Sequence, residues 1–135
     1  EDKKRDVLWL AVMSGPEPQR TMFENLVIEK AKSVHGKVVI LRALPDSSEE
    51  PSDLPPNVTV FNHVNDEMFV SLVRRSEVII CRGGYTSLMD LAILNRKAFL
   101  VPTPGQTEQE YLAEYLSDKG FRWCRQKEFL DIEII

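Results

Sequence analysis

The chain has 135 residues, which is close to the commonest size of one compact domain. Hydrophobic residues make up 43% of it and charged residues 28%, enough for one core and an ordinary polar surface. The formal net charge of −4 argues against nucleic acid as a partner, because surfaces that bind nucleic acid gather Lys and Arg. No apolar run reaches the roughly 18 residues of a membrane span, and no signal peptide is visible.

The first six residues and the two cysteines indicate where the domain begins and whether disulfides stabilise it. Residues 1–6 are highly charged, and we interpret them as a linker remnant at the start of a single domain over residues 1–135. Two cysteines are too few for a disulfide framework. Cys81 ends an apolar run, which indicates a reduced and buried thiol.

Apolar, β-branched runs alternate with helical patterns along the chain. The runs predict strands at residues 7–13, 37–41, 58–61, 77–81, 98–101 and 121–124. Helices are predicted at residues 21–35, 66–74, 87 to about 94, and 108–118. Residues 43–56 are rich in Pro, Ser, Asp and Glu and predict a solvated, mobile loop. This alternation predicts right-handed βαβ units and therefore an α/β fold with a Rossmann-like, doubly wound parallel sheet.

Helix ends are predicted from local capping patterns. Thr21 and Glu24 have capping-box spacing at the start of the first helix. Gly36 and Gly120 are placed to end the first and last helices.

Ligands of such sheets bind beyond the carboxyl ends of the strands, so we expect four loops to line one rim: 14–20, 62–65, 82–87 and 103–109. The strongest local signal is the pair Gly83 and Gly84. Paired glycines let the backbone approach a ligand, and free N–H groups at a helix start favour an anion such as a diphosphate. A tight turn without a ligand is the alternative. The pair is neither a P-loop nor a Gly-x-Gly-x-x-Gly motif.

Two polar positions near the predicted rim have both a binding and a structural interpretation. Asp90 lies one turn into the helix after the glycines, where a carboxylate can accept hydrogen bonds from two ribose hydroxyls. Its alternative is a capping box with Ser87. Gln109 offers an amide to a sugar hydroxyl, or is simply an exposed helix residue. Thr107 and Glu110 also have capping-box spacing.

No complete catalytic or metal-binding set is visible. His63 follows the strand at 58–61 and either lines a pocket for a base or sugar or is an ordinary loop residue. The two histidines lie far apart, so no zinc spacing exists. No Gly-x-Ser-x-Gly elbow appears. We therefore assign no catalytic residue and no metal site to this chain.

The stretch 78–92, followed by residues 99–102 and 109–111, resembles the C-terminal domain of family 28 glycosyltransferases. That family includes the transferase that adds N-acetylglucosamine to the undecaprenyl-linked peptidoglycan precursor. The resemblance rests on motifs from residue 58 to residue 120 and on topology alone before that. It implies a GT-B fold, in which two Rossmann-like domains face each other across a cleft. The C-terminal domain of such a protein binds a nucleotide sugar, usually a UDP-sugar.

The resemblance also implies roles for individual residues. Gly83 and Gly84 match the phosphate-side loop, and Asp90 stands where the family usually has a Glu that binds the ribose. The pair Gln109 and Glu110 stands where the family has two Gln residues that contact the donor sugar. The implied set is Ser14, Gly15, Arg20, Arg82, Gly83, Gly84, Thr86, Ser87 and Asp90 for nucleotide and phosphate, Asn62, His63 and Val64 for the base, and Gln109 and Glu110 for the sugar.

The first loop departs from the family's Gly- and Ser-rich pattern. Pro16 and Pro18 remove backbone donors, so we expect Ser14, Gly15 or Arg20 to meet the phosphates instead. Arg20 either supplies charge to the site or is a solvated residue at the helix start.

By resemblance the full protein is an inverting transferase that moves a hexosyl or N-acetylhexosaminyl group from a UDP-sugar to an acceptor hydroxyl, with no metal or other cofactor. The general base would belong to an N-terminal acceptor-binding domain, in cis or on a separate chain, so this domain alone should bind donor without transfer. A lipid-linked or glycan acceptor would place the protein in the cytoplasm, peripheral to the inner membrane face. The alternatives are half of a nucleotide-sugar hydrolase or epimerase, and a non-catalytic interaction domain.

Overall fold

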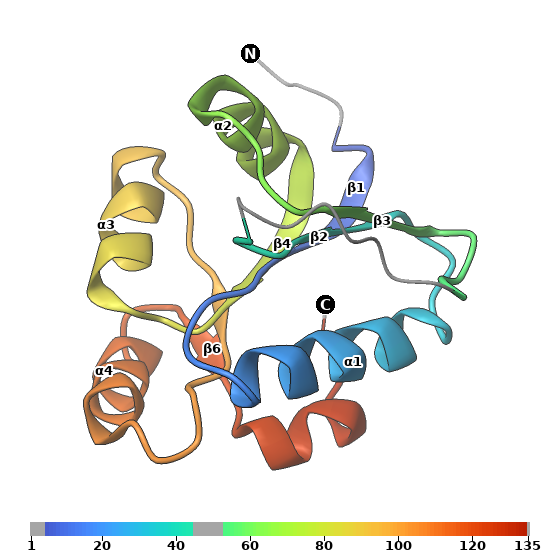
Figure 1. Ribbon diagram of the computed structural model, residues 1–135. Helices are drawn as coiled ribbons and strands as arrows, with labels where there is room; N and C mark the ends of the chain where they lie inside the picture. The colour runs from blue at the N-terminus through green and yellow to red at the C-terminus, as the bar shows by residue number, and fades with distance from the viewer. Residues whose placement is uncertain (1–4, 45–52, 135) are drawn as a thin grey trace.

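The computed structural model describes residues 5–44 and 53–134. Within them, six strands form one parallel sheet in the order β3-β2-β1-β4-β5-β6 (Figure 1). The strands are β1 (Val7–Val12), β2 (Val38–Leu41), β3 (Val58–Phe61), β4 (Ser76–Cys81), β5 (Phe99–Leu100) and β6 (Arg122–Trp123). This is the strand order of dinucleotide-binding Rossmann folds. The predicted doubly wound parallel sheet is therefore confirmed.

Helices cover both faces of the sheet. They are α1 (Gln19–Ala31), α2 (Asp66–Arg75), α3 (Tyr85–Ile93), α4 (Thr107–Ser117) and the short 3-10 helix η1 (Gln126–Asp131). Helices α1 and η1 pack on one face, and α2, α3 and α4 pack on the other (Figure 1). Helix η1 was not predicted, because six residues are too few to show a helical period.

Alternate residues of β1 supply the two halves of the core. Trp9 is buried with Phe23 of α1 and Phe129 of η1. Leu10 points to the opposite face, where it is buried with Leu72 of α2 and Leu91 of α3. Because helices cover both faces, β1 and β2 are apolar along their whole length rather than alternating with polar residues.

The predicted ends of the first helix are wrong. Helix α1 begins at Gln19 with Pro18 at its N-cap, and it is the Glu17 side chain that accepts a hydrogen bond from a first-turn N–H, that of Thr21 at 3.1 Å. The carboxylate of Glu24 is buried in an ion pair with Arg20 instead of reaching back to the helix start. The helix ends at Ala31, and Gly36 has another role. A Cβ at Gly36 would lie 2.6 Å from the Cβ of Leu8, so only glycine fits there.

Other element ends follow the prediction more closely. Helix α3 begins two residues before the predicted start at residue 87. Gly120 follows α4 with a φ of +93°, as expected of a helix-ending glycine, and β6 forms the predicted edge strand. Residues 45–52 of the loop predicted to be mobile lie outside the described residues. In the predicted linker, Asp6 accepts two hydrogen bonds from Arg75 at 2.9 and 2.8 Å, so this residue belongs to the folded unit.

Candidate functional site

The connections from β1 and β4 leave the sheet toward opposite faces. The loop after β1 leads to α1 on one face, and the loop after β4 leads to α3 on the other (Figure 1). These two strands are neighbours, so the topological switch point lies beyond their carboxyl ends, where sheets of this kind have their ligand-binding crevice. The sheet order thus brings the loops at residues 14–18 and 82–84 together, as predicted.

Glycines shape both loops at the crevice. Gly15 and Gly83 have φ angles of +96° and +88°, which favour residues without a Cβ. Gly84 has an ordinary φ of −67°, and a Cβ added there would meet nothing within 4 Å. Gly84 is the N-cap of α3, and no side chain within the described residues caps that helix. The N–H groups of the first turn of α3, which includes Thr86 and Ser87, are therefore directed toward this edge of the sheet.

Arg82 lies beneath these loops rather than in the crevice. Its side chain is 1% exposed. It donates hydrogen bonds to the carbonyl oxygens of Val101 at 3.2 Å, Pro102 at 3.5 Å and Gln19 at 3.0 Å. Burial lowers the pKa of Arg82 to about 10, which still leaves it cationic at neutral pH. No carboxylate of the described residues pairs with it, so the site has an uncompensated positive charge beneath it.

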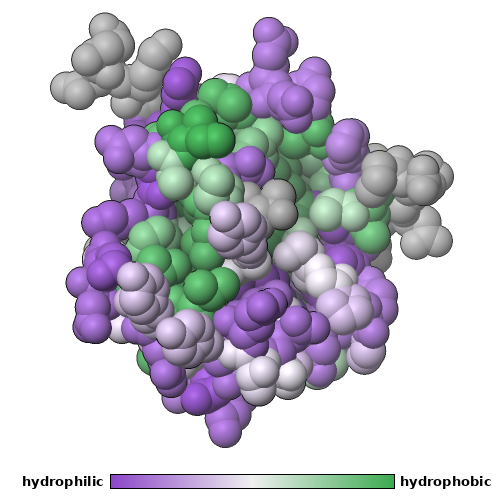
Figure 2. Space-filling view, turned by 90° about the vertical axis from the view of Figure 1, so that its left-hand side faces the viewer, coloured by the Kyte–Doolittle hydropathy of each residue, from purple (hydrophilic) through white to green (hydrophobic). Residues whose placement is uncertain are grey.

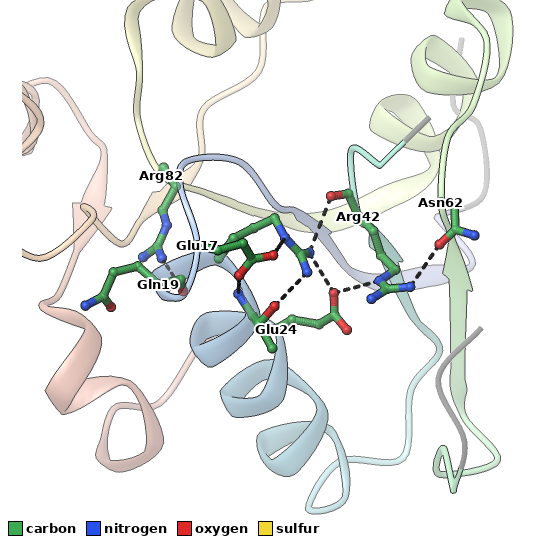
Figure 3. Close-up of polar contacts among 8 residues, drawn as sticks. Glu17, Gln19, Glu24, Arg42, Asn62 and Arg82 are labelled. Atoms are coloured by element: carbon green, nitrogen blue, oxygen red, sulfur yellow. Dashed lines mark hydrogen bonds and ion pairs between the residues drawn. The ribbon is translucent and has the colours of Figure 1, made fainter. Parts of the chain in front are cut away.

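Arg20 is buried as well, but its charge is neutralised. It forms ion pairs with Glu17 at 2.9 Å and with Glu24 at 2.8 Å (Figure 3). The interpretation of Arg20 as a solvated helix-start residue is wrong, because only 4% of its side chain is exposed. Its two carboxylate partners also argue against Arg20 as the source of positive charge for a phosphate. Arg82, by contrast, forms no ion pair with a carboxylate of the described residues.

Asp90 faces a groove between α2 and α3. The capping-box alternative for Ser87 and Asp90 is wrong, because α3 begins at Tyr85 with Gly84 as its N-cap. The carboxylate of Asp90 is exposed and lines a groove of about 240 Å³. The other lining residues are Asp66, Phe69, Val70, Ile93 and Leu94. A carboxylate at the edge of a partly apolar groove suits a ribose with a flat base beside it.

The predicted base loop follows β3. Asn62 is held by Arg42, whose Nη1 donates to the Asn62 Oδ1 at 3.0 Å. At the other end of the loop, the Asn65 side chain caps α2 by accepting from the N–H of Met68 at 2.8 Å. His63 is exposed between them, and Val64 is half-buried in the core cluster under α2. The loop is thus anchored at both ends.

The two predicted sugar residues have structural partners. The Gln109 Oε1 accepts a hydrogen bond from the N–H of Thr103 at 2.8 Å, so Gln109 is not the exposed helix residue of its alternative interpretation. Glu110 pairs with Arg125 at 3.2 Å. The capping-box alternative for Thr107 and Glu110 is wrong, because α4 begins at Thr107 and its N-cap is Gln106. The Gln106 side chain makes no capping hydrogen bond. Contact of these residues with a donor sugar remains a prediction.

The described residues hold no group of three or more His, Cys, Asp or Glu side chains that could bind a metal ion. Cys81 and Cys124 are both free and buried, which confirms the interpretation of Cys81. Burial raises the pKa of each thiol to about 11, so neither is a reactive nucleophile near neutral pH.

Several residues that build the site were missed from the sequence. Glu24 pairs with Arg20 at i,i+4 spacing, which is a local helical signal, whereas Arg42 joins Glu24 through a contact that only the fold reveals. Thr103 and Gln126 are buried beside the switch point, with the Thr103 Oγ1 and Gln126 Oε1 lacking a hydrogen-bond partner among the described residues. Single polar residues in loops give no periodic signal, so no pattern could have singled them out.

The architecture defines the class of protein. Solved GT-B glycosyltransferases share this α/β fold. The spinosyn rhamnosyltransferase SpnG superposes with a TM-score of 0.70 at 18% identity, covering 96% of this chain and 36% of that chain. MurG of Acinetobacter baumannii superposes with a TM-score of 0.62 at 20% identity, covering 94% and 38%. The fold is that of the C-terminal half of a GT-B protein.

The family follows from a second comparison. The model of the glycosyltransferase family 28 C-terminal domain matches residues 19–135, and the chain belongs to that family. A 61-residue stretch is 34% identical to the UDP-N-acetylglucosamine--N-acetylmuramyl-(pentapeptide) pyrophosphoryl-undecaprenol N-acetylglucosamine transferase of Histophilus somni (strain 129Pt). This match covers 44% of the chain and 17% of the relative, and the chain spans little more than a third of the solved structures. In residues 5–44 and 53–134, no helix combines the length and apolarity that crossing a bilayer requires.

Proposed function

We propose that this chain is the donor-binding half of an inverting glycosyltransferase and that it binds the diphosphate of a UDP-sugar at the switch point. One observation carries the proposal: the buried cation Arg82 lies beneath two glycine loops and beside the uncapped start of α3. Backbone N–H groups at a helix start, with a buried and uncompensated positive charge beneath them, suit a dianionic group.

In this proposal the nucleotide lies across α3. The diphosphate meets the loops of Gly15 and Gly83, the ribose hydroxyls meet Asp90, and the base lies by the loop Asn62–Val64. The structure of SpnG complexed with thymidine diphosphate supports a nucleoside diphosphate as ligand, since that protein superposes on this chain with a TM-score of 0.66. The H. somni relative, whose name includes UDP-N-acetylglucosamine, supports UDP.

In the proposed reaction an acceptor hydroxyl attacks the anomeric carbon of the donor sugar, and the bond to the diphosphate oxygen breaks. The negative charge that develops on the departing UDP is stabilised by the N–H groups of α3 and by Arg82. The base that takes the acceptor proton belongs to the N-terminal domain, so this chain alone binds donor without transfer. A lipid-linked acceptor is supported by the name of the relative above, which includes pyrophosphoryl-undecaprenol.

An exposed apolar face on α3 favours a second role in protein contact. Tyr85, Met89 and Ile93 lie one turn apart and are 71%, 47% and 78% exposed. Figure 2 shows apolar side chains gathered on this side of the molecule. If the chain binds no nucleotide, this face supports a non-catalytic interaction domain instead.

Calorimetric titration of the chain with UDP tests the proposal. We expect saturable binding of UDP, weaker binding of GDP, and about tenfold weaker UDP binding in Asp90→Ala, which removes a charged hydrogen-bond acceptor. Asp118→Ala is the matched control, because Asp118 is an exposed aspartate at the opposite end of its helix from the crevice. Absence of UDP binding at millimolar concentration would overturn the proposal.

A further inference from the structure

The carboxylate of Glu24 is buried between two arginines. Glu24 is 3% exposed, and its Oε1 accepts hydrogen bonds from the Arg20 Nη1 at 2.8 Å and the Arg42 Nε at 2.9 Å (Figure 3). An apolar residue on this face of α1 would contribute to the core without the cost of desolvating a charge. Ionic groups retained at such a position can specify one conformation of the segments they join.

Through Arg20, Glu24 reaches the loop after β1. The Arg20 Nε donates to the Glu17 Oε2 at 2.9 Å, and the Glu17 Oε1 accepts from the N–H of Thr21 at 3.1 Å. These contacts tie the loop that carries Gly15 to the first turn of α1.

Through Arg42, Glu24 also reaches the loop after β3. The Arg42 Nη1 donates to the Asn62 Oδ1 at 3.0 Å. Backbone hydrogen bonds also connect these two segments. The N–H of Arg42 donates to the carbonyl oxygen of Phe61 at 2.9 Å, and the N–H of Leu44 donates to that of Asn62 at 2.8 Å. Figure 3 shows the line of contacts from Glu17 to Asn62, with Glu24 at its centre.

The two loops have no direct connection through the sheet. Strand β2 separates β1 from β3, so the network spans the carboxyl end of β2. Two carboxylates balance two guanidinium groups among Glu17, Arg20, Glu24 and Arg42, so the network adds little net charge to the site. Its contribution to a ligand is therefore the spacing of the two loops rather than electrostatic attraction.

We propose that Glu24 is a positioning residue for the nucleotide site, which sets the distance between the diphosphate loop and the base loop. This inference rests on the proposed function. A ligand that uses one loop gains nothing from the spacing, whereas a nucleoside diphosphate that spans both loops depends on it.

The test compares three ligands by calorimetry: UDP, uridine and inorganic pyrophosphate. In Glu24→Gln we expect UDP to bind about tenfold more weakly, while uridine and pyrophosphate change by less than about twofold. Glu29→Gln is the control, because it makes the same substitution at an exposed position of α1. Thermal unfolding establishes that each variant is folded. If the Glu24→Gln variant is unfolded, the Arg42→Lys variant is used in its place. Lysine keeps the charge but cannot bridge Glu24 and Asn62 in the same geometry.

Two outcomes would overturn the inference while leaving the proposed function intact. One is unchanged UDP affinity in the folded variant. The other is an equal loss for all three ligands, which is the result expected of a merely structural residue. If the unmodified chain fails to bind UDP, the proposed function itself is overturned and the inference falls with it.

Discussion

The guanidinium carbon of Arg82 lies 4.3 Å from the centroid of the Phe23 ring, so a buried cation from the loop after β4 rests on an aromatic side chain of α1. Phe23 in turn meets Phe129 edge-to-face, with 5.4 Å between the ring centroids. A cation–π contact of this kind holds a guanidinium in place without cancelling its charge, as a carboxylate would. This separates Arg82 from Arg20, which has two carboxylate partners.

Replacing Arg82 tests the source of positive potential. Arg82→Met keeps the contact with Phe23 but removes the charge, and we expect about tenfold weaker UDP binding with little change for uridine. Arg74→Met is the control, since Arg74 is exposed in the last turn of α2, away from the crevice. Calorimetry measures both ligands. Equal losses for UDP and uridine would show that Arg82 supports the fold and not the phosphate site.

Substitutions at the neighbouring Gly83 and Gly84 test two different things: backbone strain in the first case, and the access of a diphosphate in the second. Gly83→Ala forces a side chain into a left-handed conformation and should lower the free energy of unfolding by about 1–2 kcal/mol. Gly84→Ala has no such strain, so its cost should be below about 1 kcal/mol. Its methyl group would nevertheless project into open space where our proposal places the diphosphate. Urea unfolding and calorimetry together should show a less stable Gly83→Ala and a stable Gly84→Ala with weaker UDP binding. Unimpaired binding by Gly84→Ala would place the diphosphate elsewhere.

Gln109 accepts a structural hydrogen bond from Thr103, and two substitutions distinguish this role from contact with a donor sugar. Gln109→Ala leaves the N–H of Thr103 without its acceptor and should lower the free energy of unfolding by about 1–3 kcal/mol. Gln109→Glu keeps an acceptor but loses the amide donor. We expect Gln109→Glu to bind UDP normally and a UDP-sugar more weakly. If its affinity for both ligands matches that of the unmodified chain, the Gln109 amide does not contact the sugar.

The buried thiol of Cys81 makes stability depend on pH. Burial raises its pKa from the ordinary 9.0 to about 11. Between these values the unfolded chain has lost a proton that the folded chain keeps, so stability falls as the pH rises. From pH 8 to pH 10 this thiol should account for a loss of about 1 kcal/mol. The loss should be absent from Cys81→Ala, in which every other group still titrates. Parallel pH profiles for the two proteins, measured by urea unfolding, would refute this account.

The sheet could be predicted because its signals are local and repeated. Short apolar runs such as the four residues of β2 alternate with helical patterns, and this alternation is typical of a parallel α/β fold. Helix starts were less predictable. Thr21 and Glu24 have capping-box spacing, yet the carboxylate of Glu24 forms ion pairs with Arg20 and Arg42, and the helix begins at Gln19 after Pro18. Tertiary contacts of the Glu24 side chain therefore determined where the helix begins, and the local capping pattern did not.

The site was predictable to the level of loops but not of side chains. The meeting of the Gly15 and Gly83 loops follows from strand order, so it could be inferred once a parallel sheet was predicted. The different roles of Arg20 and Arg82 could not, because both arginines flank a loop and look alike in the sequence. Only their partners separate them: carboxylates for Arg20, and carbonyl oxygens with an aromatic ring for Arg82.

The pairing of β1 with β4 also has a kinetic consequence. Val7 pairs with Ser76 and Ala11 with Ile80, residues about seventy positions apart, so this contact closes a long loop and is slow to form. The crevice lies on that seam. A partly folded chain that has joined β1 only to β2 lacks the proposed nucleotide site, so a ligand bound between β1 and β4 selects fully folded molecules. Nucleotide would then raise the unfolding temperature of the whole domain and slow its cleavage by proteases.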